Sequence, residues 1–231
     1  MRFAIIAAGE GSRLAEEGLN VPKPLVPIDG IPMIERLAGI LMRQDADRIA
    51  VIINGKSAET LALLESMSRR IPLDLVVRNT LSPMHSLLAL APFLDSDRFC
   101  AMTVDTVFQE ERFSRMITEF TNTGFDGIMG VTSFVDDEKP LYVSVDDSME
   151  IQGFHDTEER CRFVSAGIYC LKKEALDVLS KCVEEGGRRM RLFQRRLIEE
   201  GMRLKAFDLG RVIDVDHLSD VGKAEQIAQE K

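Results

Sequence analysis

The sequence predicts an α/β fold, with one domain over residues 1–231 and a mixed, mostly parallel sheet flanked by helices. In the first half, short apolar runs alternate with segments of helical periodicity, a pattern typical of βαβ units. In the second half, the strand-like runs are shorter and clean crossover helices are fewer. A chain of 231 residues can bury a substantial core in one large domain.

The first half begins with an apolar run that is expected to form a buried strand. A helix starting near Pro32 places apolar residues, among them Ile34 and Leu41, on one face. Ser57 is expected to cap the next helix, because its hydroxyl can accept a backbone N–H. The predicted strands are residues 3–8, 49–53, 73–77 and 99–104, and the predicted helices start near 32, follow 57 and span 84–94.

The second half contains an aspartate-rich turn between residues 145 and 151, which predicts a hairpin. The acidic residues 136–138 predict a solvated loop rather than a metal site. The predicted strands are residues 127–135, 141–145, 163–171 and 203–209, and the predicted helices are 173–185, 189–200 and a closing helix from 219.

Composition excludes several classes of partner. A net charge of −9 and a pI near 5.0 argue against nucleic acid, which requires a basic face. The four cysteines lack the spacing of a zinc site and are expected to be reduced thiols. No apolar run approaches the length that a bilayer requires, so we expect no membrane partner and a cytoplasmic location. The sequence leaves the choice between a monomer and a homo-oligomer open.

The loop after the first strand has the composition of a phosphate-binding turn. Gly9 and Gly11 allow a sharp bend that presents backbone N–H groups, and Ser12 follows them directly. Arg13 offers a fixed fork of donors for phosphate oxygens. Ten residues later Lys23 stands between two prolines, which keep it out of a helix and direct its side chain.

This segment resembles the nucleotidyltransferases that make nucleotide sugars and related activated alcohols. Their signature is an apolar strand, then G-x-G-[ST]-R-[LM], then PKP[LM], and every element is present in residues 3–25. A neighbouring family member with a GTP-dependent role in molybdenum-cofactor synthesis differs in the context of its lysine. The resemblance implies a Rossmann-like, GT-A-like fold, with a nucleotide-binding half at 1–125 and an acceptor-binding half at 126–231.

The reaction that the resemblance implies is attack of a phosphate monoester on the α-phosphorus of a nucleoside triphosphate, with release of pyrophosphate. The nucleophile is already an anion, so the enzyme must position and neutralise charge rather than supply a base. Arg13, with the backbone from Ala8 to Ser12, suits the triphosphate. Lys23 suits the junction between the α-phosphate and the acceptor phosphate.

A divalent cation, expected to be Mg²⁺, must offset the remaining charge, and Mg²⁺ prefers carboxylate and phosphate oxygens. Asp105 follows the strand 99–104, where the family has a Gly-Asp pair, although Val104 replaces the glycine. Asp214 falls on the family's metal aspartate in the C-terminal motif, and Asp216, expected on the same face of a strand, could share or replace it. The ordinary alternative for both is a turn or helix-cap residue.

The segment after residue 77 is expected to select the base. It resembles the asparagine-and-serine version found in cytidylyltransferases more than the glycine-rich version of sugar-nucleotide enzymes. Asn79 is interpreted as a contact to ribose or base, and Ser82 or Ser86 as a helix cap facing the nucleotide. The alternative is plain turn chemistry. His85 is interpreted as a structural or rim residue rather than a catalyst, because the implied chemistry moves no proton.

For the acceptor, Ser165-Ala166-Gly167 resembles the family's N-A-G strand, in which small residues let a sugar approach the backbone. Ser165 replaces the family's asparagine, which removes one amide. The basic run at residues 188–191 is expected to be a solvated helix start, and contact with the acceptor phosphate is the alternative.

These observations predict a Mg²⁺-dependent nucleotidyltransferase that uses a nucleoside triphosphate and a sugar phosphate or related phosphate monoester. One alternative is a CTP-dependent cytidylyltransferase for phosphocholine or a similar phosphoalcohol. An alternative of another class is a non-catalytic regulatory protein that binds a nucleotide sugar. A glycosyltransferase would need Asp-x-Asp after the middle strand, and Asp105-Thr106-Val107 lacks the second carboxylate.

Overall fold

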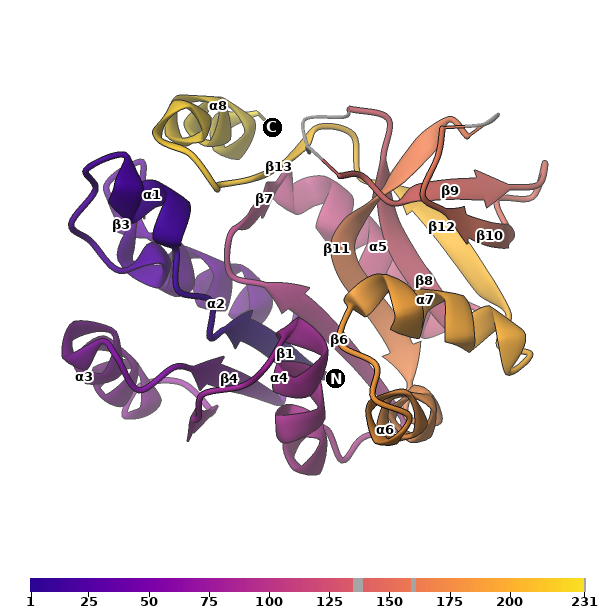
Figure 1. Cartoon of the computed structure of the whole chain (residues 1–231), viewed down its shortest axis with the longest axis horizontal. Helices are drawn as coiled ribbons and strands as arrows, with labels where there is room; N and C mark the ends of the chain where they lie inside the picture. Colours follow the sequence, from indigo (N-terminus) through magenta and orange to yellow (C-terminus); the bar gives the residue numbers. More distant parts are fainter. Residues whose placement is uncertain (135–138, 159–160, 231) are drawn as a thin grey trace.

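The computed structural model describes residues 1–134, 139–158 and 161–230. The acidic loop expected at 136–138 lies outside the described residues. A nine-stranded sheet runs through the molecule and takes strands from both halves of the chain (Figure 1). Its strands are β1 (Arg2–Ala7), β4 (Arg48–Ile53), β5 (Leu73–Val77), β6 (Arg98–Thr103), β8 (Gly127–Thr132), β9 (Tyr142–Val145), β10 (Ile151–His155), β11 (Phe163–Lys172) and β12 (Leu204–Asp208).

The parallel part of the sheet is β6-β1-β4-β5, with β1 between β4 and β6. The long strand β11 runs antiparallel to β6, β8 and β9, and β12 pairs with β8 in parallel. The antiparallel pair β9 and β10 confirms the hairpin predicted at residues 145–151. The predicted mixed α/β sheet with flanking helices is therefore confirmed.

The helices cover both faces of the sheet. Figure 1 shows α4 and α7 in front of it and α2 and α5 behind. Strand β1 is buried on both faces, with Ile5 in one hydrophobic cluster and Ile6 in the other, which explains its unbroken apolar run. The helices are α1 (Ser12–Glu16), α2 (Met33–Arg43), α3 (Ala58–Ser68), α4 (Pro83–Leu90), α5 (Glu110–Asn122), α6 (Ala175–Glu184), α7 (Met190–Glu199) and α8 (Leu218–Gln229), with 3₁₀ turns η1 (Lys23–Leu25) and η2 (Ala91–Phe93).

Most predicted elements are present, with shifted ends. Ser57 caps α3 as predicted, its hydroxyl accepting the N–H of Thr60 at 3.0 Å. The helix predicted over 84–94 is wrong at its C-terminal end: α4 stops at Leu90 and a 3₁₀ turn follows, because Pro92 has no N–H to donate to the carbonyl of Leu88. Strand β8 ends at Thr132, earlier than predicted.

Two small sheets did not follow from the sequence. One pairs β2 (Pro27–Ile28) with β3 (Ile31–Pro32), and the other pairs β7 (Thr106–Phe108) with β13 (Val212–Asp214). The second brings the C-terminal segment against the end of β6. No helix within the described ranges combines the length and apolar character needed to cross a membrane.

Candidate active site

The candidate site lies where β1 and β6 end side by side. These strands are parallel neighbours, so the glycine turn after Ala7 and the loop that carries Asp105 meet at one edge of the sheet. In open parallel sheets ligands bind outside the carboxyl ends of the strands. The short β7–β13 pair then places Asp214 against the same edge.

The two glycines of the turn have different roles. Gly11 adopts a left-handed conformation, with φ of 65°, and a Cβ on it would lie 2.8 Å from the Cβ of Lys23. A Cβ on Gly9 would meet no atom within 4 Å among the described residues. Gly11 is therefore required for the close approach of Lys23, whereas Gly9 carries no such packing constraint.

We expect Gly11→Ala to destabilise the fold by about 1–2 kcal/mol or more, because a left-handed conformation is strained for alanine and the added Cβ displaces Lys23. Gly9→Ala is the matched control, and its effect should stay within about 0.5 kcal/mol. Urea unfolding of both variants measures the difference. Equal midpoints for the two variants would contradict this assignment.

Lys23 is held by two carboxylates. Its side chain is only 10% exposed, and its Nζ forms ion pairs with Asp105 and, at 2.6 Å, with Asp216. Burial lowers the pKa of Lys23, but attraction and hydrogen bonds from Asp105 and Asp216 outweigh burial and raise the pKa above its ordinary value. Lys23 therefore keeps its positive charge at the centre of the site.

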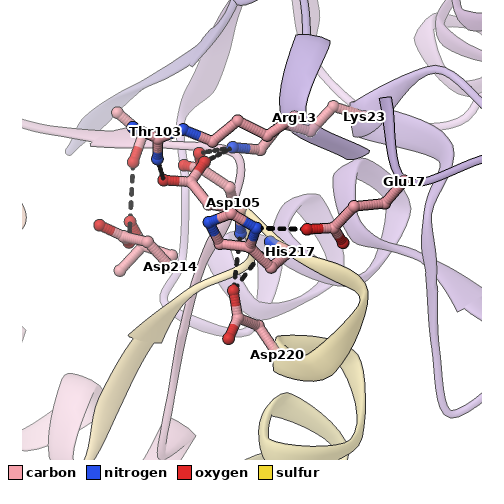
Figure 2. A network of polar contacts seen from close by, with 10 residues as sticks. Arg13, Glu17, Lys23, Thr103, Asp105, Asp214, His217 and Asp220 are labelled. Atoms are coloured by element: carbon pink, nitrogen blue, oxygen red, sulfur yellow. Dashed lines mark hydrogen bonds and ion pairs between the residues drawn. The ribbon is translucent and has the colours of Figure 1, made fainter. Parts of the chain in front are cut away.

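Asp216 bridges the two predicted phosphate-binding cations. Its Oδ2 accepts a hydrogen bond from Nη1 of Arg13 at 2.9 Å, while its Oδ1 accepts one from Lys23. Figure 2 shows Arg13 and Lys23 reaching from the N-terminal segment into the same group of carboxylates. Burial alone would raise the pKa of Asp216, but the hydrogen bond and charge of Lys23 lower it overall, so this carboxylate stays ionised.

Asp214 is the last residue of β13 and is exposed to the cleft, while protein atoms crowd it on its other sides. Its Oδ1 accepts a hydrogen bond from the Thr106 hydroxyl at 2.8 Å. Loss of hydration and then repulsion by Asp105 raise the pKa of Asp214 to about 7. The expectation that Asp214 and Asp216 share a strand face is wrong, because β13 ends at Asp214 and Asp216 follows it.

The carboxylates fit a magnesium ion that also binds phosphate. Oδ1 of Asp105 is buried and has no hydrogen-bond partner among the described residues, although a buried carboxylate oxygen normally has one. Asp214 adds a second carboxylate in an environment that disfavours its negative charge. The described ranges contain no cluster of three or more metal-ligating side chains. Mg²⁺ needs only one or two carboxylates when phosphates and water complete its shell.

Two residues that the sequence analysis did not identify, Asp220 and Glu17, hold the segment after Asp216 in place. Oδ2 of Asp220 accepts the backbone N–H groups of Asp216 and His217. Glu17 accepts the N–H of Leu218 at 2.7 Å and contacts Nδ1 of His217 at 2.5 Å (Figure 2), which raises the pKa of His217. The sequence could have indicated Asp220, because an acidic residue three positions after a helix cap is typical of a capping box. No sequence signal points to Glu17.

Two cavities adjoin at Arg13 and Asp216, which line both. The smaller, of about 200 Å³, lies at the glycine turn, and the larger, of about 290 Å³, lies at the acceptor strand. The predicted residues that line the smaller one are Gly9, Gly11, Ser12, Arg13, Lys23, Asp105 and Asp216. The predicted residues that line the larger one are Arg13, Ser165, Ala166, Asp214 and Asp216.

Of the segment predicted to select the base, Pro83 lines the smaller cavity, whereas Asn79, Ser82 and Ser86 do not. Ser82 caps α4 as predicted. Ser86 is not a cap: it is buried within α4, where its hydroxyl contacts Thr80 and the carbonyl of Ser82. Asn79 is exposed, and its Oδ1 accepts the N–H of Gly55.

Ala8 and Gly9 are supported by Asn54, which the sequence reasoning missed. Nδ2 of Asn54 donates to the carbonyls of both residues at 3.2 Å. These two hydrogen bonds tie the glycine turn to the residue that follows β4.

On the acceptor side, the hydroxyl of Ser165 donates to Oε1 of the buried Gln194 at 2.9 Å. Gly167 has φ of 72° at an irregularity in the pairing of β11 with β8, and it does not line the larger cavity. In the basic run, Arg191 is bound to Asp156 at 2.6 Å.

Comparison with known proteins gives a family match for most of the chain. Residues 3–200 match the family described as "MobA-like NTP transferase domain". The matched range contains the glycine turn, Lys23 and Asp105, and it ends before Asp214 and Asp216. The match confirms the resemblance to nucleotidyltransferases that the sequence motifs indicated.

Two curated relatives are similar over parts of their length. A 2-aminoethylphosphonate cytidylyltransferase from Lancefieldella rimae is 38% identical over 76 residues, which cover 33% of this chain and 29% of the relative. A bifunctional protein GlmU from Methanococcus maripaludis is 24% identical over 229 residues, 96% of this chain and 53% of the relative. The chain thus spans about half or less of the relatives it matches.

Two solved structures share the fold. The inositol-1-phosphate CTP transferase from T. maritima superposes with a TM-score of 0.80 at 18% identity, covering 99% of this chain and 98% of the other. A putative glucose-1-phosphate thymidylyltransferase from Bacillus anthracis gives a TM-score of 0.85 at 18% identity, covering 100% and 96%. At these identities the similarity establishes the GT-A-like nucleotidyltransferase fold.

Proposed function

Because this chain belongs to the MobA-like NTP transferase domain family, we propose that it transfers a nucleotidyl group from a nucleoside triphosphate to a sugar phosphate or related phosphate monoester. The observation that carries the proposal is the convergence of Arg13 and Lys23 on one anionic group, Asp216, beside Asp105. Two cations aimed at one anion at the end of a parallel sheet suit a site that holds two phosphates together.

In the proposed reaction an oxygen of the acceptor phosphate forms a bond to the α-phosphorus, and the bond from that phosphorus to the oxygen of the leaving pyrophosphate breaks. Arg13 and the backbone of residues 8–12 hold the triphosphate. Lys23, which stays charged, lies between the α-phosphate and the acceptor phosphate and offsets the charge that gathers there. No proton is transferred, so the proposed reaction requires no general base.

We propose that Mg²⁺ is bound by Asp105 and Asp214, with Asp216 as the alternative to Asp214. The partnerless oxygen of Asp105 and the crowded carboxylate of Asp214 support this assignment. The ion would supply positive charge against the phosphate oxygens. Asp216 is bound to Lys23 and Arg13, so it is a weaker candidate than Asp214.

The acceptor is proposed to occupy the larger cavity, against Ser165 and Ala166, whereas Gly167, the third residue predicted for the acceptor, lies outside its lining. The cytidylyltransferase alternative, with phosphocholine or a similar phosphoalcohol, gains support from the relatives that use CTP or are cytidylyltransferases. The regulatory alternative loses support because Arg13, Lys23, Asp105 and Asp214 are all present and assembled. The cytoplasmic location stays a prediction.

The base should be cytosine. Ser82 caps α4 directly before Pro83, which lines the smaller cavity, and we expect CTP to exceed UTP, dTTP, ATP and GTP by more than about tenfold, because polar groups that select a base are left unpaired by a wrong one. The measurement is pyrophosphate release with each triphosphate against a panel of phosphate monoesters. A comparable preference for another base would overturn this assignment, and no release with any pair would overturn the proposed activity.

A further inference from the structure

We propose that Thr106 is a positioning residue, whose hydroxyl holds the Asp214 carboxylate so that one oxygen is fixed within the protein and the other faces the cleft. Thr103 supports it from behind. The expected effect on the affinity for metal and triphosphate rests on the proposed function. The orientation of the Asp214 carboxylate does not depend on that function.

The backbone places Thr106 and Asp214 opposite one another. They are paired residues in the antiparallel ladder of β7 and β13, and the ladder continues through a bond from the N–H of Val215 to the carbonyl of Asp105 at 3.0 Å. Directly opposed residues of an antiparallel pair have neighbouring side chains on the same face. The same short ladder therefore sets the separation of the two candidate metal carboxylates and brings the threonine hydroxyl to one of them.

The hydrogen bonds have one direction. Thr106 Oγ1 donates to Oδ1 of Asp214 at 2.8 Å, and a hydroxyl has a single proton to donate. At 2.7 Å from Oγ1 of Thr106, the Thr103 hydroxyl must therefore be the donor in that contact. The resulting chain of hydrogen bonds, from Thr103 to Thr106 to Asp214, fixes the position of one oxygen of Asp214. Thr103 and Asp214 lie on the same side of the cluster in Figure 2.

The hydroxyl pair cannot easily move away. Thr106 is only 2% exposed. On its other side lies Gly167, where an added Cβ would be 3.4 Å from Oγ1 of Thr106 and 3.8 Å from Oγ1 of Thr103. The irregular segment of the acceptor strand therefore packs against the two hydroxyls and confines them. The hydrogen bond from Thr106 therefore restrains the Asp214 carboxylate as well.

The test uses four variants of the whole chain. Thr106→Val keeps the shape and removes the hydroxyl, Thr106→Ser restores it, and Thr103→Val removes only the supporting donor. Thr123→Val is the control, because Thr123 is a partly buried threonine whose hydroxyl accepts the N–H of Phe125 away from the site. Two quantities are measured: the orientation of Asp214 in ligand-free crystals, and the binding of Mn²⁺ with CTP by electron paramagnetic resonance.

Thr106→Val should turn the Asp214 carboxylate in the crystal and weaken Mn²⁺ binding by about 10- to 100-fold, the range for losing a partner of a metal ligand. Thr106→Ser should restore both, Thr103→Val should have a smaller effect, and Thr123→Val should have none. An unmoved Asp214 with unchanged binding in Thr106→Val overturns the inference, as does failure of serine to restore them. If wild type binds no Mn²⁺ with any common triphosphate, the proposed function fails, and the Asp214 orientation alone decides the inference. If Thr106→Val does not fold, the serine and Thr103→Val variants decide it by the same criteria.

Discussion

Replacing Lys23 with alanine is expected to lower turnover by about 10²- to 10³-fold, while the affinity for the triphosphate changes far less. Lys23 lies between Asp105 and Asp216, at the place where the two reacting phosphates would meet. Its attraction for them grows as they approach, so its loss acts on the transition state more than on the bound substrate. The measurement is kcat and KM for the triphosphate, together with its dissociation constant.

Lys205→Ala is the control for this experiment. Lys205 also forms an ion pair, with Glu119 at 2.6 Å, but lies on β12 and outside both cavities. Its substitution should leave kcat unchanged. If Lys23→Ala kept its turnover and only raised KM, Lys23 would be a ground-state binding residue, and the role given to it would be wrong.

Asp105→Asn and Asp214→Asn are each expected to reduce the rate by about 100-fold or more and to weaken its dependence on Mg²⁺. If both carboxylates bind one ion, losing either disrupts the same site. The double variant should therefore lose little beyond the more damaging single one. Rates measured across a series of Mg²⁺ concentrations test this for wild type and the three variants.

The control is Asp97→Asn, which removes an exposed carboxylate paired with Lys173 far from the cleft. It should match wild type at every Mg²⁺ concentration. Additive losses in the double variant would indicate two separate sites. Full wild-type activity in the presence of a chelator would rule out the metal proposal.

The central strands could be predicted because a strand that is buried on both faces consists of a continuous run of apolar residues. Strand β5 matches its predicted range, and β1, β4 and β6 each begin one residue earlier than predicted, at an arginine. The pair of β7 and β13 could not be predicted, because strands of three residues are too short to show a period.

The same limit applies to the candidate site. Motifs identified the residues that carry charge, and the structure assembles Arg13, Lys23 and Asp105 as expected. The residues that hold the surrounding segments in place belong to no motif. Asn54 binds the glycine turn, Thr106 binds Asp214 and Glu17 binds Leu218, each across segments distant in the chain. Such partners depend on register and packing, which local composition does not encode.

In the proposed function, the bridge formed by Asp216 would make phosphate binding an exchange of one anion for another. A phosphate that binds both Arg13 and Lys23 would have to displace this carboxylate. Its affinity for the two cations would therefore be set by competition with a carboxylate rather than with water. Weak or singly charged anions gain little from that exchange, whereas a triphosphate offers more charge and more oxygens. Because Asp216 belongs to the chain, it would compete at a constant local concentration, and in the proposed reaction it would return to the two cations as pyrophosphate departs.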